Sequence, residues 1–133
     1  MDIVDQIVTF FEDKDEVVAV YLFGSYASGK QRYNSDIDLG ILFEVNSRKV
    51  HYQLIDKFIS PLSRLVRRDL HVVPLNSAGE ELLKQVFKKG RCLLVNNSNK
   101  LAKFKMTAFS KIADFGYYQQ MIKDGFTKKL MET

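Results

Sequence analysis

Two short apolar runs joined by a polar segment constrain the fold of this chain more than any other feature. The first run covers residues 17–23 and the second covers residues 39–43. Runs of this length that are bounded by turn residues and rich in β-branched and aromatic side chains are typical of buried strands. We therefore expect strands at 17–23 and 36–43, with only a turn or a short helix at 24–35.

Acidic residues open the second predicted strand. Asp36 and Asp38 flank Ile37, and side chains alternate between the two faces of a strand, so both carboxylates point the same way while Ile37 points into the core. Two carboxylates about 7 Å apart on one strand face repel each other unless a cation lies between them. Hard ions such as Mg²⁺ take oxygen ligands and bridge carboxylates to phosphates. The pair is therefore a candidate metal site.

A glycine and a serine end the first predicted strand. Gly24 and Ser25 offer backbone N–H groups and a hydroxyl that could cradle a phosphate. Taken separately, a Gly-Ser turn and an Asp-x-Asp strand start are common and often have no catalytic role. Together, between two strands, a phosphate-binding turn and a metal-binding pair indicate phosphoryl or nucleotidyl transfer.

A third carboxylate is expected from a later strand at residues 69–75. Transfer with two metal ions held about 3.5 to 4 Å apart usually needs one more acidic ligand. Asp69 reaches the same end of the sheet if its strand lies beside the second one; the alternative is an ion pair with Arg67 or Arg68. His71 shares the face of Asp69. It could contact a nucleotide or orient a carboxylate, or it could have no role.

Periodicity and turn residues predict the other elements. Helices are expected at residues 2–13, 47–67, 78–88 and from about 100 to 131, and a fourth strand at 91–95. Alternating helices and strands favour an α/β or α+β arrangement.

Local signals refine two of these helices. Pro61 removes a hydrogen bond from the helix at 47–67, so a bend is expected near residues 59–60. Residues 76–77 are expected to cap the following helix, and Gly90 to close it as a C-terminal glycine. The apolar stripe of the helix at 47–67 is expected to consist of Val50, Leu54, Phe58, Leu62 and Leu65.

Composition narrows the class of protein. A chain of 133 residues is expected to form one domain spanning 1–133. It has no apolar stretch near the roughly 20 residues that span a bilayer, and its acidic start is unlike a signal peptide. The single Cys92 excludes an intrachain disulfide and a cysteine-based zinc site, and His51 and His71 alone give no support to a histidine-based metal site. A cytoplasmic location is expected.

The spacing Gly24-Ser25, ten residues, Asp36-x-Asp38 resembles the signature of the DNA polymerase β-like nucleotidyltransferase superfamily. With the segments at 67–97 and beyond, the chain resembles the minimal nucleotidyltransferase (MNT) family nearly end to end. This resemblance implies the nucleotidyltransferase fold, a small mixed sheet of three to four strands packed by helices, with a long C-terminal helix. It also implies that members act as antitoxins of HEPN-domain toxins and transfer AMP from ATP to a tyrosine hydroxyl of the toxin.

The resemblance also implies roles for individual residues. Gly24 and Ser25 would bind the triphosphate, Asp36 and Asp38 would bind two Mg²⁺ ions, and Asp69 would complete the metal site and assist deprotonation of the acceptor hydroxyl. Many relatives carry arginines after the Gly-Ser turn, whereas here Lys30 and Arg32 are the nearby cations, and Lys30 is the candidate for binding the phosphates.

Two alternatives stay open. One is an idle antitoxin that neutralises a HEPN partner by binding alone; the other is nucleotidylation of a small molecule. The net charge of +4 resides in residues 100–133, which hold seven lysines against three acidic residues. Aromatic residues beyond one core stripe, including Tyr117 and Tyr118, lie there too, so this segment is predicted to bind the partner protein. Direct nucleic-acid binding is not expected.

Overall fold

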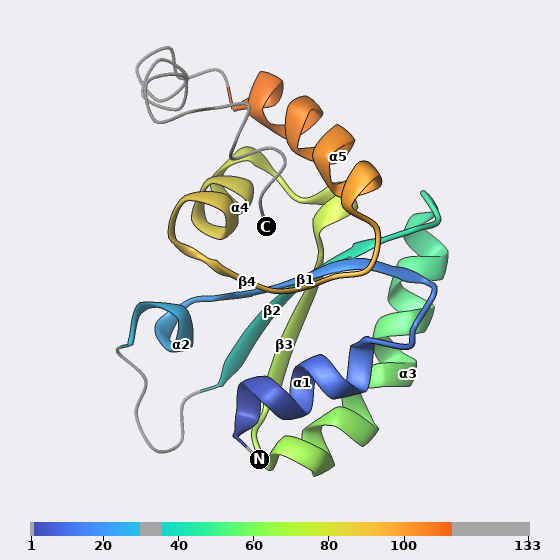
Figure 1. Cartoon of the computed structure of the whole chain (residues 1–133), viewed down its shortest axis with the longest axis vertical. Coiled ribbons are helices and arrows are strands. Elements are labelled where there is room, and N and C mark those ends of the chain that lie inside the picture. The colour runs from blue at the N-terminus through green and yellow to red at the C-terminus, as the bar shows by residue number, and fades with distance from the viewer. Residues whose placement is uncertain (1, 30–35, 113–133) are drawn as a thin grey trace.

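The computed structural model, which describes residues 2–29 and 36–112, contains a four-stranded sheet between two layers of helices (Figure 1). The strands are β1 (Val17–Phe23), β2 (Ile37–Phe43), β3 (Leu70–Pro74) and β4 (Arg91–Val95). Their order across the sheet is β3-β2-β1-β4. β1 is antiparallel to both of its neighbours, and β2 is parallel to β3, so the predicted mixed sheet is confirmed.

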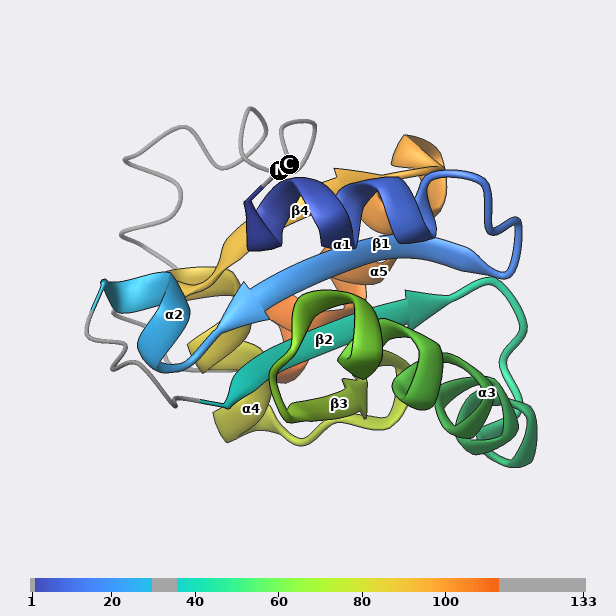
Figure 2. The ribbon, with the colours of Figure 1, turned by 90° about the horizontal axis from the view of Figure 1, so that it is seen from below.

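Helices cover both faces of the sheet. They are α1 (Ile3–Phe11), α2 (Ser25–Ser28), α3 (Arg48–Val66), α4 (Glu80–Lys84) and α5 (Ser98–Lys111). α1 and α3 pack on one face, while α4 and α5 pack on the other (Figure 2). β1 is buried along its whole length because it is central and covered on both faces.

The alternation of β2 determines which face carries the acidic residues. Ile37, Leu39 and Ile41 are each 0% exposed and pack against α1 and α3. Full burial of one such side chain contributes roughly 1.5 to 3 kcal/mol, so a register slip by one residue, which would remove all three from their packing against α1 and α3, is strongly disfavoured. Asp38 therefore lies on the opposite face, the one that α4 and α5 cover.

The buried stripe of α3 differs from the predicted one. It consists of His51, Ile55, Phe58, Leu62 and Val66. Leu65, expected in the core, is 46% exposed, while His51 is 1% exposed. The His51 ring stacks on Phe43 with 4.9 Å between centroids, and its Nε2 contacts the carbonyl of Val45. An aromatic ring and a carbonyl thus surround His51, a residue outside the predicted apolar stripe, while its Nδ1 is buried without a hydrogen-bond partner among the described residues. α3 also continues through Pro61, which does not divide it.

The prediction that residues 76–77 cap the helix now labelled α4 is wrong. Residues 75–77 form a 3-10 turn, and α4 starts only after Gly79. The Asn76 side chain instead contacts β2: its Oδ1 accepts a bond from the Phe43 N–H at 2.8 Å, and its Nδ2 donates to the Phe43 carbonyl at 3.0 Å. A partner distant in sequence outcompeted the local capping geometry.

The helical stretch that begins with α4 ends at Gly90, as predicted, and the Gly90 N–H donates a hydrogen bond to the Val86 carbonyl at 3.0 Å. α4 continues as a π-helical segment, residues 85–89, before Gly90. Gly90 has φ −80° and ψ 172°, an extended conformation rather than the left-handed one of a C-terminal glycine. Glycine is required there by close packing, because a Cβ would lie 2.3 Å from the Val86 carbonyl oxygen.

The last described helix begins as predicted. The Asn97 side chain caps α5 by accepting a hydrogen bond from the Lys100 N–H at 3.1 Å. The predicted continuation of this helix to about residue 131, together with Tyr117 and Tyr118, lies outside the described residues. Over residues 2–29 and 36–112, none of the helices has both the length and the apolar character to cross a membrane.

Cys92 on β4 lies beside Tyr21 on the central strand β1. Cys92 pairs with Tyr21 across β1 and β4 and is partly buried against the core under α4 and α5. Burial raises the pKa of the Tyr21 hydroxyl, and Cys92 raises it further.

Candidate active site

Strand directions bring the candidate residues to one end of the sheet (Figure 1). β1 runs into Gly24, whereas β2, antiparallel to it, starts directly after Asp36. β3 is parallel to β2 and starts directly after Asp69. The Ile37 N–H donates a hydrogen bond to the Asp69 carbonyl at 2.9 Å. The expectation that Asp69 reaches the same end as Asp36 and Asp38 is therefore confirmed.

The Gly24 turn lies directly against the Asp38 carboxylate. Phe23 pairs with Asp38 across β1 and β2, so the next residue, Gly24, passes over this side chain. Its φ of 72° and ψ of −151° are accessible almost only to glycine. A Cβ on Gly24 would lie 2.3 Å from Asp38 Oδ2. Both the conformation and the space at this position thus require glycine, and Ser25 starts α2 immediately beyond it.

His71 holds the other oxygen of the same carboxylate. Asp38 and His71 are cross-strand partners in the parallel pair of β2 and β3. His71 Nδ1 lies 3.1 Å from Asp38 Oδ1, and the side chains are 66% and 25% exposed. Of the roles that the sequence left open for His71, the structure shows contact with a carboxylate.

Asp36 and Asp69 are exposed at the sheet end, beside the partly buried Asp38. Within residues 2–29 and 36–112, no three acidic, histidine or cysteine side chains lie close enough together to hold a metal ion. The donor set still fits Mg²⁺, because the three candidate ligands are carboxylates that lie at one end of the sheet. Metal ligation by these residues stays a prediction, and Lys30 lies outside the described residues.

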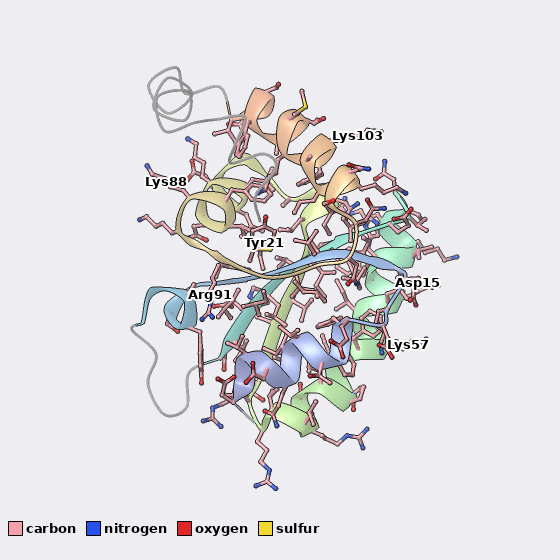
Figure 3. All side chains as sticks on the ribbon, viewed as in Figure 1. Asp15, Tyr21, Lys57, Lys88, Arg91 and Lys103 are labelled. Carbon is pink, nitrogen blue, oxygen red and sulfur yellow. The ribbon has the colours of Figure 1, made fainter. Side chains whose placement is uncertain are left out.

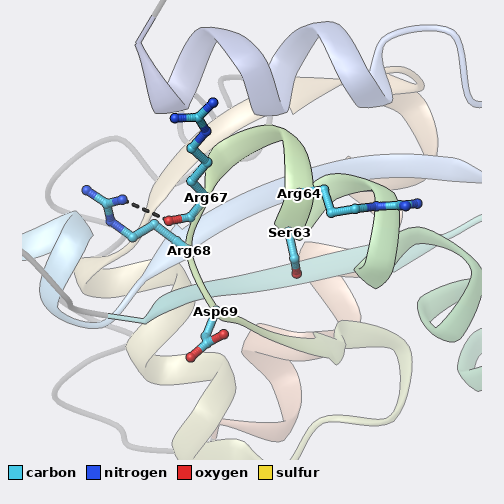
Figure 4. A pocket seen from close by; sticks show the side chains of 5 residues that line it. All are labelled: Ser63, Arg64, Arg67, Arg68 and Asp69. Atoms are coloured by element: carbon cyan, nitrogen blue, oxygen red, sulfur yellow. Dashed lines mark hydrogen bonds between the residues drawn. The ribbon is translucent and has the colours of Figure 1, made fainter.

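Three arginines surround the turn that leads into Asp69. A cavity of about 380 Å³ is lined by Ser63, Arg64, Arg67, Arg68 and Asp69 (Figure 4). Arg67 has a left-handed backbone (φ 56°), and its carbonyl accepts a hydrogen bond from Arg68 Nη1 at 2.9 Å. Figure 4 shows the Arg64 and Arg68 side chains pointing to opposite sides, while Arg67 points towards α1. Among the described residues no ion pair joins Asp69 to Arg67 or Arg68, so that alternative for Asp69 is not seen.

A further basic residue lies at this end on β4. Arg91 pairs with Leu22, two residues before Gly24, and is exposed. Figure 3 shows Arg91 and Lys88 on the side of the molecule where α2 lies, and Asp15 and Lys57 on the opposite side. Sequence reasoning missed Arg91 because its proximity to the Gly-Ser turn depends on β4 pairing with β1. No local pattern near Arg91 indicates that pairing.

The sheet, its two helical layers and the Gly-Ser turn facing a strand-borne carboxylate define the class of nucleotidyltransferase-fold proteins. The chain belongs to the polymerase β nucleotidyltransferase family, whose model matches residues 5–99.

Within this family, the chain is similar to a curated adenylyltransferase. Over 75 residues the chain is 37% identical to the protein adenylyltransferase MntA of Shewanella oneidensis strain MR-1. This match spans 56% of the chain and 51% of MntA, about half the length of that relative.

Two solved structures are similar in fold to this chain over most of its length. A toxin–antitoxin crystal structure with AMP-PNP has a TM-score of 0.66 and 27% identity, covering 93% of this chain and 98% of that one. A tri-AMPylated Shewanella oneidensis HEPN toxin in complex with an MNT antitoxin gives a TM-score of 0.60 at 24% identity, covering 94% of this chain and 96% of that one. The latter similarity concerns the fold. Together these matches confirm the nucleotidyltransferase fold and the resemblance to MNT antitoxins.

Proposed function

We propose that this chain transfers AMP from ATP to a hydroxyl group, that of a tyrosine, on a cognate HEPN-domain toxin in the cytoplasm, and thereby acts as its antitoxin. The observation that carries the proposal is the packing of Gly24 against Asp38, with Asp36 and Asp69 at the same end of the sheet. A glycine turn for phosphates beside exposed carboxylates is what nucleotidyl transfer needs. The similarity to MntA and to a toxin–antitoxin structure with AMP-PNP supports the same reaction.

The nucleotide would bind on the β1 side of the site. Gly24 and Ser25 would contact the triphosphate through their backbone N–H groups and through the serine hydroxyl. Arg91, exposed at the start of β4 at the same end of the sheet, would supply positive charge to these phosphates in addition to Lys30. The base would then extend away from the carboxylates, and the α-phosphate would lie towards Asp38.

The acceptor would approach from the β3 side, where Asp69 is exposed. Its hydroxyl oxygen forms a bond to the α-phosphorus, the bond between the α- and β-phosphates breaks, and pyrophosphate leaves. Asp69 would take the hydroxyl proton. Two Mg²⁺ ions held by Asp36, Asp38 and Asp69 would, when bound, stabilise the charge on the α-phosphate and the leaving group.

The arginine turn beside Asp69 fits a protein acceptor. Arg64, Arg67 and Arg68 contribute three positive charges around one carboxylate at the cavity. Such a basic surface attracts an acidic region of a partner and speeds the encounter. The diverging directions of the three side chains suit a broad protein surface better than a single small anion.

The proposal is tested by incubating the protein with Mg²⁺, ATP and the HEPN protein encoded beside it, followed by mass spectrometry of both chains. The expected result is a mass increase of the HEPN protein by one or more AMP units. Asp69→Asn should still bind the partner but add no AMP. Asp15→Asn, an exposed aspartate at the other end of β1, is the matched control and should transfer normally. Neutralisation of the toxin by Asp69→Asn without any mass increase would establish the binding-only alternative.

A further inference from the structure

We propose that His71 is a positioning residue that orients the Asp38 carboxylate for metal and nucleotide binding. This inference rests on the proposed function, since it assigns to Asp38 the role of a metal ligand. No local sequence pattern specifies the role, because His71 and Asp38 are 33 positions apart in the chain.

The hydrogen bond between the two residues has a defined direction. An ionised carboxylate can only accept hydrogen bonds, so His71 Nδ1 carries the proton and donates it to Asp38 Oδ1 over 3.1 Å. The contact does not depend on a long, mobile side chain, because the two residues are register partners on neighbouring strands. His71 is thus held beside Asp38 by the backbone of the sheet.

Asp38 is confined on both sides. The terminal torsion of an aspartate is broad and two-fold, so an isolated carboxylate samples many orientations. Here Oδ1 accepts the hydrogen bond from His71, while Oδ2 occupies the space that Gly24 leaves by lacking a Cβ. The result is a carboxylate whose Oδ2 faces the phosphate-binding turn, where an ion bridging to a phosphate would have to lie.

A packing role does not explain His71. Its side chain is 66% exposed and belongs to neither core cluster, whereas its neighbour Val72 packs against the core under α1 and α3. Replacing His71 should therefore leave the fold and its stability nearly unchanged. Residues that orient metal ligands through hydrogen bonds typically affect metal affinity by 10- to 100-fold.

The test measures binding of Mn²⁺, as a spectroscopic substitute for Mg²⁺, by the full chain with and without ATP at one fixed pH. His71→Leu removes the donor, and His71→Asn keeps an N–H donor close to the position of Nδ1. We expect His71→Leu to weaken Mn²⁺ binding by about 10- to 100-fold and His71→Asn to bind nearly as the original chain does. Both variants should keep the original melting temperature.

A double-mutant cycle with Asp38→Asn gives the decisive comparison. If His71 acts through Asp38, His71→Leu should cause no further loss in the Asp38→Asn background. Unchanged Mn²⁺ affinity in His71→Leu, an equal loss in His71→Asn, or additive losses in the double mutant would each overturn the inference. Normal Mn²⁺ binding by Asp38→Asn would overturn it as well, together with the metal-site assignment.

The Mn²⁺-binding test can fail or succeed independently of the test for AMP transfer. Mn²⁺ affinity is measured without any partner protein, so it reports on the site even if no AMP is transferred to a HEPN protein. In steady-state assays with a competent acceptor, His71→Leu should lower kcat at subsaturating Mg²⁺, and excess Mg²⁺ should restore it.

Discussion

Asp38 Oδ2 lies in the space that any side chain on Gly24 would need, since a Cβ built on Gly24 would be 2.3 Å from that oxygen. The two residues come from different strands, β1 and β2, and meet because Phe23 is the register partner of Asp38. The phosphate-binding turn and the acidic pair are therefore parts of one packed unit. A change in either should disturb the other.

Gly24→Ala should abolish nucleotide binding. The substitution forces an L-residue into a backbone region that costs about 1 to 3 kcal/mol, and its methyl group displaces the Asp38 carboxylate. We expect a lower melting temperature and no further stabilisation by Mg²⁺ with ATP in differential scanning fluorimetry.

Gly29→Ala is the control for this experiment. Gly29 also has a positive φ, 73°, but a Cβ there meets nothing within 4 Å. This variant should lose about 1 to 2 kcal/mol of stability from backbone strain alone and keep its response to Mg²⁺ and ATP. An equal loss of that response in both glycine variants would contradict the role of the Gly24–Asp38 contact.

Replacing both Asp36 and Asp38 should remove the effect of Mg²⁺ on the melting temperature. In the original chain Mg²⁺ with ATP should raise the melting temperature by mass action, because the ligands bind only the folded state. Asp36→Asn combined with Asp38→Asn should eliminate that increase and leave the fold intact, since both carboxylates lie outside the apolar core. Asp15→Asn serves as the comparison. A metal-dependent shift that persists in the double variant would rule out these two residues as ligands.

Arg91→Ala should weaken the use of ATP without affecting the acceptor. A charge-assisted hydrogen bond to a phosphate contributes about 1.5 to 3 kcal/mol, which corresponds to a roughly 10- to 150-fold higher KM for ATP. The rate at saturating ATP and the affinity for the partner should change little. Lys103→Ala, an exposed cation on α5, should leave the KM unchanged. Identical KM values for the two variants would show that Arg91 does not contact the phosphates.

Asn76→Ala should destabilise the end of β2. The variant loses the hydrogen bonds of 2.8 and 3.0 Å that Asn76 makes with the backbone of Phe43, leaving both groups without this partner. The expected cost is about 1 to 3 kcal/mol, measured from urea unfolding at constant m-value. Asn46→Ala, at an exposed position, should change stability by no more than about 0.5 kcal/mol. A similarly small effect of Asn76→Ala would mean that water replaces the amide.

Local patterns predicted the strands and the character of the site. β-branched and aromatic runs with turn residues at their ends located β1 and β2 because strand formation depends on side chains that are close in sequence. The alternation around Ile37 placed Asp36 and Asp38 on one face for the same reason, and Ile37 is indeed fully buried. These inferences needed only the two-residue period of a strand.

The wrong predictions involve residues whose partners are distant in sequence. Asn76 is a good capping residue, yet it bonds to Phe43; His51 lies outside the predicted apolar stripe, yet it is buried and stacks on Phe43. In each case a local propensity worth about 1 kcal/mol was outweighed by packing or long-range hydrogen bonds.

The sequence by itself determined that a Gly-Ser turn and two like-facing aspartates lie at the ends of adjacent strands, because that spacing acts over a short stretch of chain. Only the tertiary structure decided that Asp38 lies between Gly24 and His71, and that Arg91 is at the same end of the sheet. Those relationships depend on strand order and register. Strand order and register are set because both faces of the sheet are buried against helices at the same time. A slip by one residue would turn every side chain of a strand to the opposite face.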